Sequence, residues 1–170
     1  HMGRHFSRVE TADALDGALA ALPGETLMAI EYLDATGRDG LSRKYRVMIV
    51  DHVLYPLHLA ISRDWKVHYF SADMADNPAH RAEEAAFLAD LASLGPGAVA
   101  ALERIRDALG LEYGGIDFGL SEEGEILLFE ANATMIAALP AADPIWDYRR
   151  GPAQTARAAA RHMLAARAGV

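Results

Sequence analysis

The chain has 170 residues with an apolar fraction of 52%, a charged fraction of 24% and a net charge of −8. This length is enough to bury the core of one domain, and no apolar run is long enough to cross a membrane. The absence of cysteine excludes disulfides, thiolate metal sites and cysteine nucleophiles. The negative net charge argues against electrostatic binding to nucleic acid. We expect a single domain over residues 1–170, with residues 1–2 as a tag remnant, in a cytoplasmic protein.

The first third of the chain predicts one helix followed by a series of strands. Thr11 is a helix N-cap, and leucines at helical spacing follow until Pro23-Gly24. The segments expected to be strands are then TLMAIEYLD (26–34), RKYRVMIV (43–50), VLYPLHLAIS (53–62) and WKVHYF (65–70). Pro56 cannot donate a ladder hydrogen bond, so its strand is expected at an edge or at a bulge.

Helices and a β-hairpin follow. Asn77-Pro78 begins a helix that ends before Gly95, and a second helix ends at Gly110. YGGIDFGL, the turn SEEG and EILLFEAN form a hairpin, and a last helix covers 153–168. This order predicts an α+β fold, an antiparallel sheet with helices packed on one face.

The hairpin gathers oxygen ligands on one face. If Leu120 pairs with Glu125 across a four-residue turn, Asp117 lies opposite Leu128, and Glu130 and Asn132 share its face. Asp117 and Glu130 are then diagonal neighbours, roughly 7–8 Å apart. Two carboxylates and an amide oxygen suit Mg²⁺, which keeps several waters and takes phosphate oxygens as further ligands. The alternative is a solvated hairpin in which Glu130 is paired with a basic side chain.

Two other groups of residues, a candidate zinc site and a candidate hydrolase triad, are less well supported by the sequence. His58 and His68 on neighbouring predicted strands suggest zinc, but a third ligand is missing and strand histidines are commonly structural. Asp51-His52 with Ser62 lacks the context of a hydrolase nucleophile.

The pattern GLEYGGIDFGL, a turn, then EILLFEANATM resembles the metal-binding hairpin of the ATP-grasp superfamily. In that family an acid on one strand and an E-x-N pair on the next hold magnesium between ATP phosphates. The resemblance assigns the metal to Asp117, Glu130 and Asn132. The segments RKYRV, YPLHLAIS, WKVHYF, RAEEAAFL and FEANATM resemble the ATP-grasp segment at the end of some tetratricopeptide-repeat proteins, related to glutathione-synthetase and RimK-like ligases.

The same resemblance implies a nucleotide site. MAIEYLD resembles the strand along the adenine, where Glu31 accepts from the adenine amino group and the Tyr32 and Leu33 backbone meets the ring. SRKYRVMIV resembles the strand whose basic residues, here Lys44 and Arg46, reach the phosphates. Arg46 is the expected catalytic group, because a guanidinium suits a developing acyl-phosphate charge.

The family implies ATP-dependent carboxylate–amine ligation through an acyl phosphate, with ATP and Mg²⁺ as cofactors and a small carboxylate, amine or peptide as substrate. The chain resembles the C-terminal half of such an enzyme. The family's preceding domain and an earlier lysine are not in this sequence, and Asn132 is not followed by the family's proline-glycine loop. The alternative is therefore a non-catalytic binding or assembly module, with an exposed sheet that could form a homodimer.

Overall fold

The computed structural model describes residues 5–68 and 72–169, which fall into two compact units, His1–Leu33 and Asp34–Val170. In the first unit a 3₁₀ turn, η1 (Ala12–Ala14), leads into the short helix α1 (Leu15–Ala21). The expected helix is therefore present, although it begins with a 3₁₀ turn.

The strand expected over residues 26–34 is wrong, because this segment has no ladder partner and is assigned no strand. Strand backbone groups need a neighbouring strand for their hydrogen bonds, which the local pattern of side chains does not supply. Met28 and Ile30 are 88% and 65% exposed.

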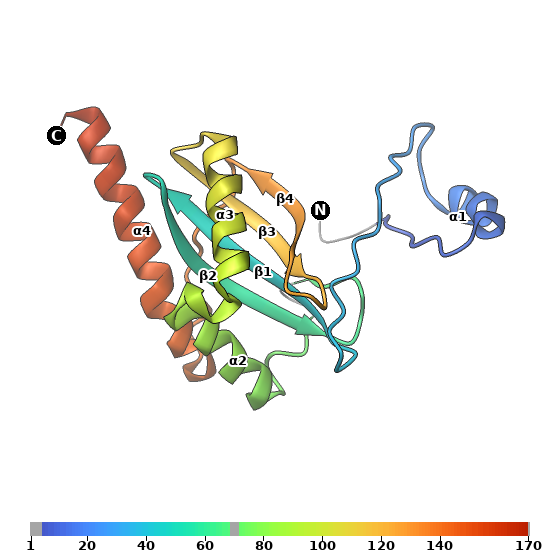
Figure 1. The fold of residues 1–170 in the computed structure, drawn as a ribbon, viewed down its shortest axis with the longest axis horizontal. Helices are drawn as coiled ribbons and strands as arrows, with labels where there is room; N and C mark the ends of the chain where they lie inside the picture. The colour runs from blue at the N-terminus through green and yellow to red at the C-terminus, as the bar shows by residue number, and fades with distance from the viewer. Residues whose placement is uncertain (1–4, 69–71, 170) are drawn as a thin grey trace. The chain divides into compact units, whose positions relative to one another are not determined.

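The second unit is built on a four-stranded antiparallel sheet with the order β2-β1-β3-β4 (Figure 1). The strands are β1 (Ser42–Val50), β2 (Val53–Ser62), β3 (Tyr113–Leu120) and β4 (Ile126–Asn132). Asp51 and His52 turn the chain between β1 and β2 with φ of 49° and 62°, as expected for a two-residue hairpin. The α+β class and the antiparallel sheet are confirmed, and Pro56 lies on an edge strand.

The segment expected as a third consecutive strand, 65–70, is not a strand over the residues that are described. Residues 65–68 form bends and irregular chain, and Tyr69 and Phe70 lie outside the described residues. The sheet instead places β3, which arrives about fifty residues later in sequence, beside β1.

One face of the sheet is covered by α2 (Pro78–Ala89), η2 (Leu91–Leu94) and α3 (Pro96–Leu109). The Asn77 side chain accepts from the backbone N–H groups of Ala79 and His80, which caps α2 as its sequence predicts. Gly110 ends α3 in the left-handed conformation, with φ of 59°. Val47, Ile49, Ile116 and Phe118 supply the sheet's side of this core.

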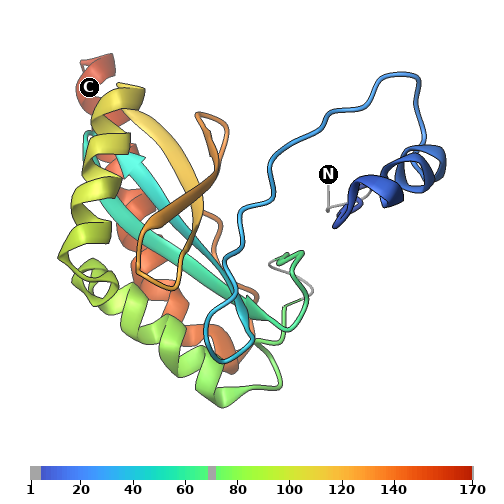
Figure 2. The same ribbon diagram turned by 45° about the vertical axis from the view of Figure 1, so that its right-hand side comes forward.

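The last helix, α4 (Asp147–Ala168), follows η3 (Pro144–Trp146) and packs on the opposite face (Figure 2). Its Ala153 and Met163 contact a second core with Met48, Val50 and Leu57. The expectation that helices pack on one face is therefore wrong. The ends of β1 and β2 carry apolar side chains on both faces, and each face needs a cover.

Among the described residues, the helices lack the combination of length and apolar character that crossing a lipid bilayer requires.

Candidate functional site

Four polar side chains form a row across one face of the sheet, one from each strand. The pairing places His58 opposite Arg46, Arg46 opposite Asp117, and Asp117 opposite Glu130. Directly opposed residues in an antiparallel sheet project to the same side. This row lies on the face that α4 covers in part, beyond the apolar contacts of Met48.

The centre of the row is a buried ion-pair cluster. Asp117 is 2% exposed, and Arg46 grips both of its oxygens, with Nε 2.5 Å from Oδ1 and Nη2 2.7 Å from Oδ2. Lys44 Nζ donates to Oδ2 at 3.1 Å. Lys44 and Arg46 thus share a face, as strand alternation predicts.

These contacts decide the ionisation of Asp117. Burial by itself raises the pKa of the carboxyl, but the Arg46 hydrogen bonds and the charges of Lys44 and Arg46 outweigh it, and the pKa is lowered. The carboxylate therefore stays ionised in a place where water is largely excluded.

Glu130 and Asn132 lie on β4, the edge strand next to Asp117. Asn132 Nδ2 donates to Glu130 Oε1 at 2.7 Å, while Asn132 Oδ1 accepts from the backbone N–H and hydroxyl of Thr134. Glu130 is exposed because β4 has solvent on its outer side. Asp117, Glu130 and Asn132 are brought together as predicted, although Asp117 and Glu130 are direct rather than diagonal partners.

Two β-bulges border the row. The β3–β4 register shifts between Asp117 and Phe118, which leaves Phe129 as the extra residue of β4. Leu120 pairs with Ile126 rather than Glu125, and Leu128 pairs with Phe118 rather than Asp117. The predicted pairings of Leu120 and Leu128 are therefore wrong, because residues 121–125 rather than 121–124 lie in the turn, which moves every pair by one residue. The bulge then adds a second shift and brings Asp117 opposite Glu130.

The β3–β4 bulge turns Phe129 toward the face of the row. Gly119 lies two residues from Asp117 on β3 and so faces the same side. A Cβ added to Gly119 would lie 2.8 Å from Phe129 Cζ. Phe129 is 41% exposed. Phe129 was not among the residues predicted for the site, so the aromatic surface beside the charged row was missed.

His58 was missed as a member of this row for the same reason. Counting back from the Asp51-His52 turn would place Leu57 opposite Arg46, but a register shift between Arg46 and Val47 brings His58 there instead. His58 is 7% exposed, and burial together with the Arg46 charge lowers its pKa to about 3. Its ring is therefore neutral at physiological pH.

A buried carboxylate on α2, that of Glu84, is hydrogen-bonded to the edge strand β2 at the residue after His58. Glu84 is fully buried, and its Oε1 accepts from the backbone N–H of Leu59 at 3.1 Å. Its Oε2 accepts from Arg149 Nε at 2.7 Å and from the Tyr148 hydroxyl. These contacts tie α2, β2 and the start of α4 together beside the row.

The predicted adenine-binding residues belong to the other unit. Glu31, Tyr32 and Leu33 lie in the unit His1–Leu33, where the Tyr32 ring lies 4.0 Å from the Arg8 guanidinium carbon. The structure brings together the five remaining predicted residues, Lys44, Arg46, Asp117, Glu130 and Asn132.

The side-chain oxygens of Asp117, Glu130 and Asn132 are the kind of ligand that a hard divalent cation prefers. Two adjacent carboxylates and an amide oxygen are oxygen ligands of the kind that Mg²⁺ takes. The carboxylate oxygens of Asp117 accept hydrogen bonds from Arg46 and Lys44, and the amide oxygen of Asn132 accepts hydrogen bonds from Thr134. Within the described ranges no three histidine or acidic side chains form a metal-binding group, so a cation here would have to complete its shell with water or phosphate.

Comparison with protein-family models, curated proteins and solved structures finds no match for this chain.

Proposed function

We propose that this chain is the Mg²⁺-nucleotide-binding part of an ATP-dependent carboxylate–amine ligase of the ATP-grasp type. The observation that carries the proposal is the row itself. Two basic side chains, Lys44 and Arg46, converge on the buried carboxylate of Asp117, with Glu130 directly opposite on the edge strand. Cations that reach phosphate and acids that hold a metal lie side by side on one face.

In this proposal the basic residues exchange partners when a nucleotide binds. Phosphate oxygens take over the N–H groups of Arg46 and the ammonium of Lys44, which releases the Asp117 carboxylate. Asp117, Glu130 and the amide oxygen of Asn132 are the residues that would hold the metal. When bound, Mg²⁺ supplies charge neutralisation between the phosphates and polarises the transferring phosphoryl group.

Arg46 has the central role among the chain's own groups. Its planar fork already matches two oxygens of a carboxylate, and the same geometry suits two oxygens of a phosphoryl group. A guanidinium at that point stabilises the negative charge that develops when phosphate passes to a carboxylate substrate. His58 lies opposite Arg46 on the neighbouring strand β2 and is neutral, so it adds no second charge next to the guanidinium.

Isothermal titration calorimetry with ATP, in Mg²⁺ and in EDTA, tests this proposal. We expect Mg²⁺ to strengthen ATP binding, and Glu130→Gln to weaken the Mg²⁺-dependent binding by at least about tenfold. Glu123→Gln removes the same charge from the turn of the same hairpin and serves as the matched control, with no expected change. Equal ATP affinity in Mg²⁺ and EDTA, or equal effects of the two variants, would contradict the site.

A second function, a binding or assembly module, is favoured by the first unit. Its segment 26–33 presents Leu27, Met28, Ile30 and Tyr32, which are 38%, 88%, 65% and 37% exposed. Apolar side chains exposed in succession are typical of interaction surfaces. Light scattering that gives a dimer mass, reduced to a monomer mass by Met28→Asp with Ile30→Asp, would support this function; a monomer mass before substitution would exclude self-assembly.

A further inference from the structure

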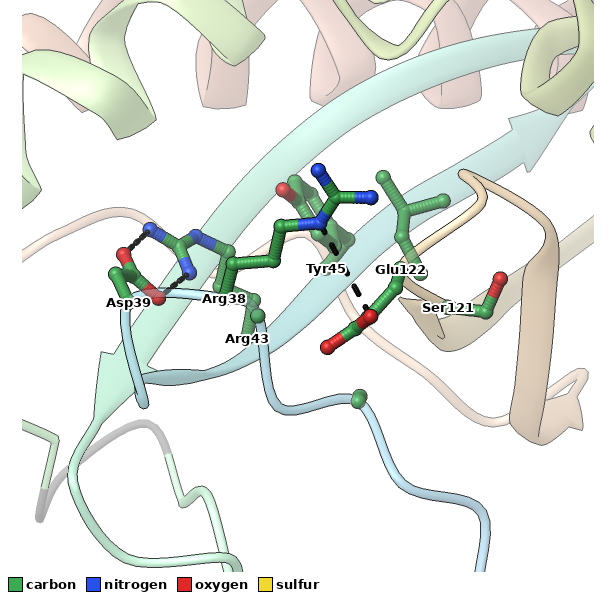
Figure 3. Close-up of a pocket in the computed structure, with 9 residues that line it drawn as sticks. Arg38, Asp39, Arg43, Tyr45, Ser121 and Glu122 are labelled. Carbon is green, nitrogen blue, oxygen red and sulfur yellow. Dashed lines mark hydrogen bonds and ion pairs between the residues drawn. The ribbon is translucent and has the colours of Figure 1, made fainter.

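A separate cavity of about 410 Å³ lies between the loop before β1 and the β3–β4 turn (Figure 3). Its apolar lining comes from Ala35, Tyr45 and Leu120. The Tyr45 ring is held by Phe118, stacked at 5.2 Å, and by Phe87, edge-on at 5.1 Å. The cavity therefore has an apolar surface that is fixed by the core.

The cavity is not part of the charged row. Arg43 and Tyr45 line it, and these residues alternate along β1 with Lys44 and Arg46, so they face the other side of the sheet. Arg43 contacts Glu83 of α2, the helix that covers that side. A ligand here would contact none of the four side chains of the row.

The basic residue inside the cavity has no donor to spare. Arg43 Nε and Nη2 donate to Glu83 at 2.6 and 3.0 Å, and Nη1 and Nη2 donate to Asp39 at 3.0 and 2.7 Å. The remaining Nη1 donation goes to the Leu41 carbonyl at 3.2 Å. These five contacts use all five N–H groups of a guanidinium. Arg43 therefore lines the cavity without offering a free N–H group, and its single positive charge lies between the carboxylates of Asp39 and Glu83.

The second basic residue crosses the cavity and is weakly held. Figure 3 shows the Arg38 side chain extending from its loop toward Glu122 on the opposite turn. Arg38 Nε lies 4.0 Å from Glu122 Oε2, and the side chains are 84% and 54% exposed. Exposed ion pairs of this kind contribute little free energy, so a competing cation can replace Arg38.

We propose that this cavity binds a guanidinium or ammonium group carried on a short apolar stem, and that Arg38 is its internal substitute. With Arg38 displaced, the carboxylates of Asp39 and Glu122 line the cavity together with the single positive charge of Arg43, which is also paired with Glu83 behind the lining. A cationic head pairs with Glu122 at the mouth, and its stem covers Ala35 and Leu120. An anionic ligand would find no available donor on Arg43 and would lie beside the carboxylates of Asp39 and Glu122.

Titration of the full chain with butylguanidinium, followed by NMR chemical shifts, tests the proposal. We expect shifts at the backbone amides of Ala35 and Leu120. Arg38→Ala should tighten binding by about twofold to fivefold because it removes the competitor, and Glu122→Gln should weaken it by about fivefold. Glu125→Gln, in the same turn but outside the cavity, is the control for general charge effects and should leave the affinity unchanged.

Two further ligands test whether the positive charge is required and where the cation comes from. Neutral butylurea has nearly the same shape and should bind much more weakly; equal binding of urea and guanidinium would overturn the proposal. Weaker binding by Arg38→Ala, or no effect of Glu122→Gln, would also overturn it. An acetylated and amidated Gly-Arg-Gly peptide distinguishes the source, because binding of peptide and butylguanidinium assigns an arginine side chain, and binding of butylguanidinium alone assigns a free small cation.

Discussion

Arg46 and Asp117 face one another across β1 and β3 and form a two-point ion pair, with Nε to Oδ1 at 2.5 Å and Nη2 to Oδ2 at 2.7 Å. The carboxylate is 2% exposed, while the Arg46 side chain is 23% exposed. The acid therefore depends on its partners, whereas the guanidinium keeps access to solvent. In the proposed function, that asymmetry would let Arg46 meet an incoming anion.

Asp117→Asn should destabilise the protein although it keeps the shape of the side chain. It removes the charge that Arg46 and Lys44 contact, and we expect a loss of about 2 kcal/mol in the free energy of unfolding, measured by urea denaturation. Asp107→Asn breaks the exposed pair with Arg106 and should leave the urea midpoint unchanged. Equal midpoints for the wild type and Asp117→Asn would show that the buried pair does not stabilise the fold.

The same acid should make stability depend on pH below about 4. The Arg46 hydrogen bonds and the Lys44 charge outweigh burial and hold the pKa of Asp117 below its usual 3.8 in the folded state. The unfolded chain therefore binds the proton first, so this stabilisation is present above pH 3.8 and is lost as the pH falls through the folded pKa. Urea midpoints between pH 6 and 2.5 should fall less steeply for Asp117→Asn than for the wild type; parallel curves would assign the acid sensitivity to other carboxyls.

Arg149→Ala should be among the most destabilising substitutions in the chain. It leaves the fully buried Glu84 carboxylate without its cation and removes the guanidinium that lies 4.3 Å from the Trp146 ring centre. A loss of about 3–5 kcal/mol is expected from urea denaturation. Tyr148→Phe, which removes only the hydroxyl that donates to Glu84, should cost about 1 kcal/mol. Similar losses for the two variants would mean that the Arg149 guanidinium stabilises this junction no more than the Tyr148 hydrogen bond does.

Phe129→Ala tests whether the bulge presents an aromatic surface to the nucleotide. If the base or ribose of ATP packs on this ring, affinity in calorimetry should fall by about tenfold, as for other stacked bases. Leu128→Ala is the matched control, because Leu128 is the neighbouring residue, is also 41% exposed and pairs with Phe118, which belongs to the face covered by α2 and α3. Loss of affinity in the control alone would place the nucleotide on the wrong face.

Much of the candidate site could be predicted because its members depend on local alternation. Lys44 and Arg46 are two residues apart on one strand, and Glu130 and Asn132 are two apart on another, so each pair shares a face wherever the strand lies. The short turn between β3 and β4 then limited the partners of Asp117 to a few positions. His58 and Phe129 could not be predicted in this way, because each depends on a bulge one residue away.

The sequence by itself determined the antiparallel hairpins, the helix start at Asn77 and the helix end at Gly110. It also determined that Lys44 shares a face with Arg46 and that Glu130 shares a face with Asn132. These follow from the two-residue period of strands, from capping chemistry and from turn length, all of which act over a few neighbouring residues. Only the tertiary structure decided that α4 covers the second face, that segment 26–33 remains without a strand partner, and that bulges bring His58 and Phe129 to the row. Those outcomes depend on which surfaces distant segments bury together, and local periodicity carries no information about that choice.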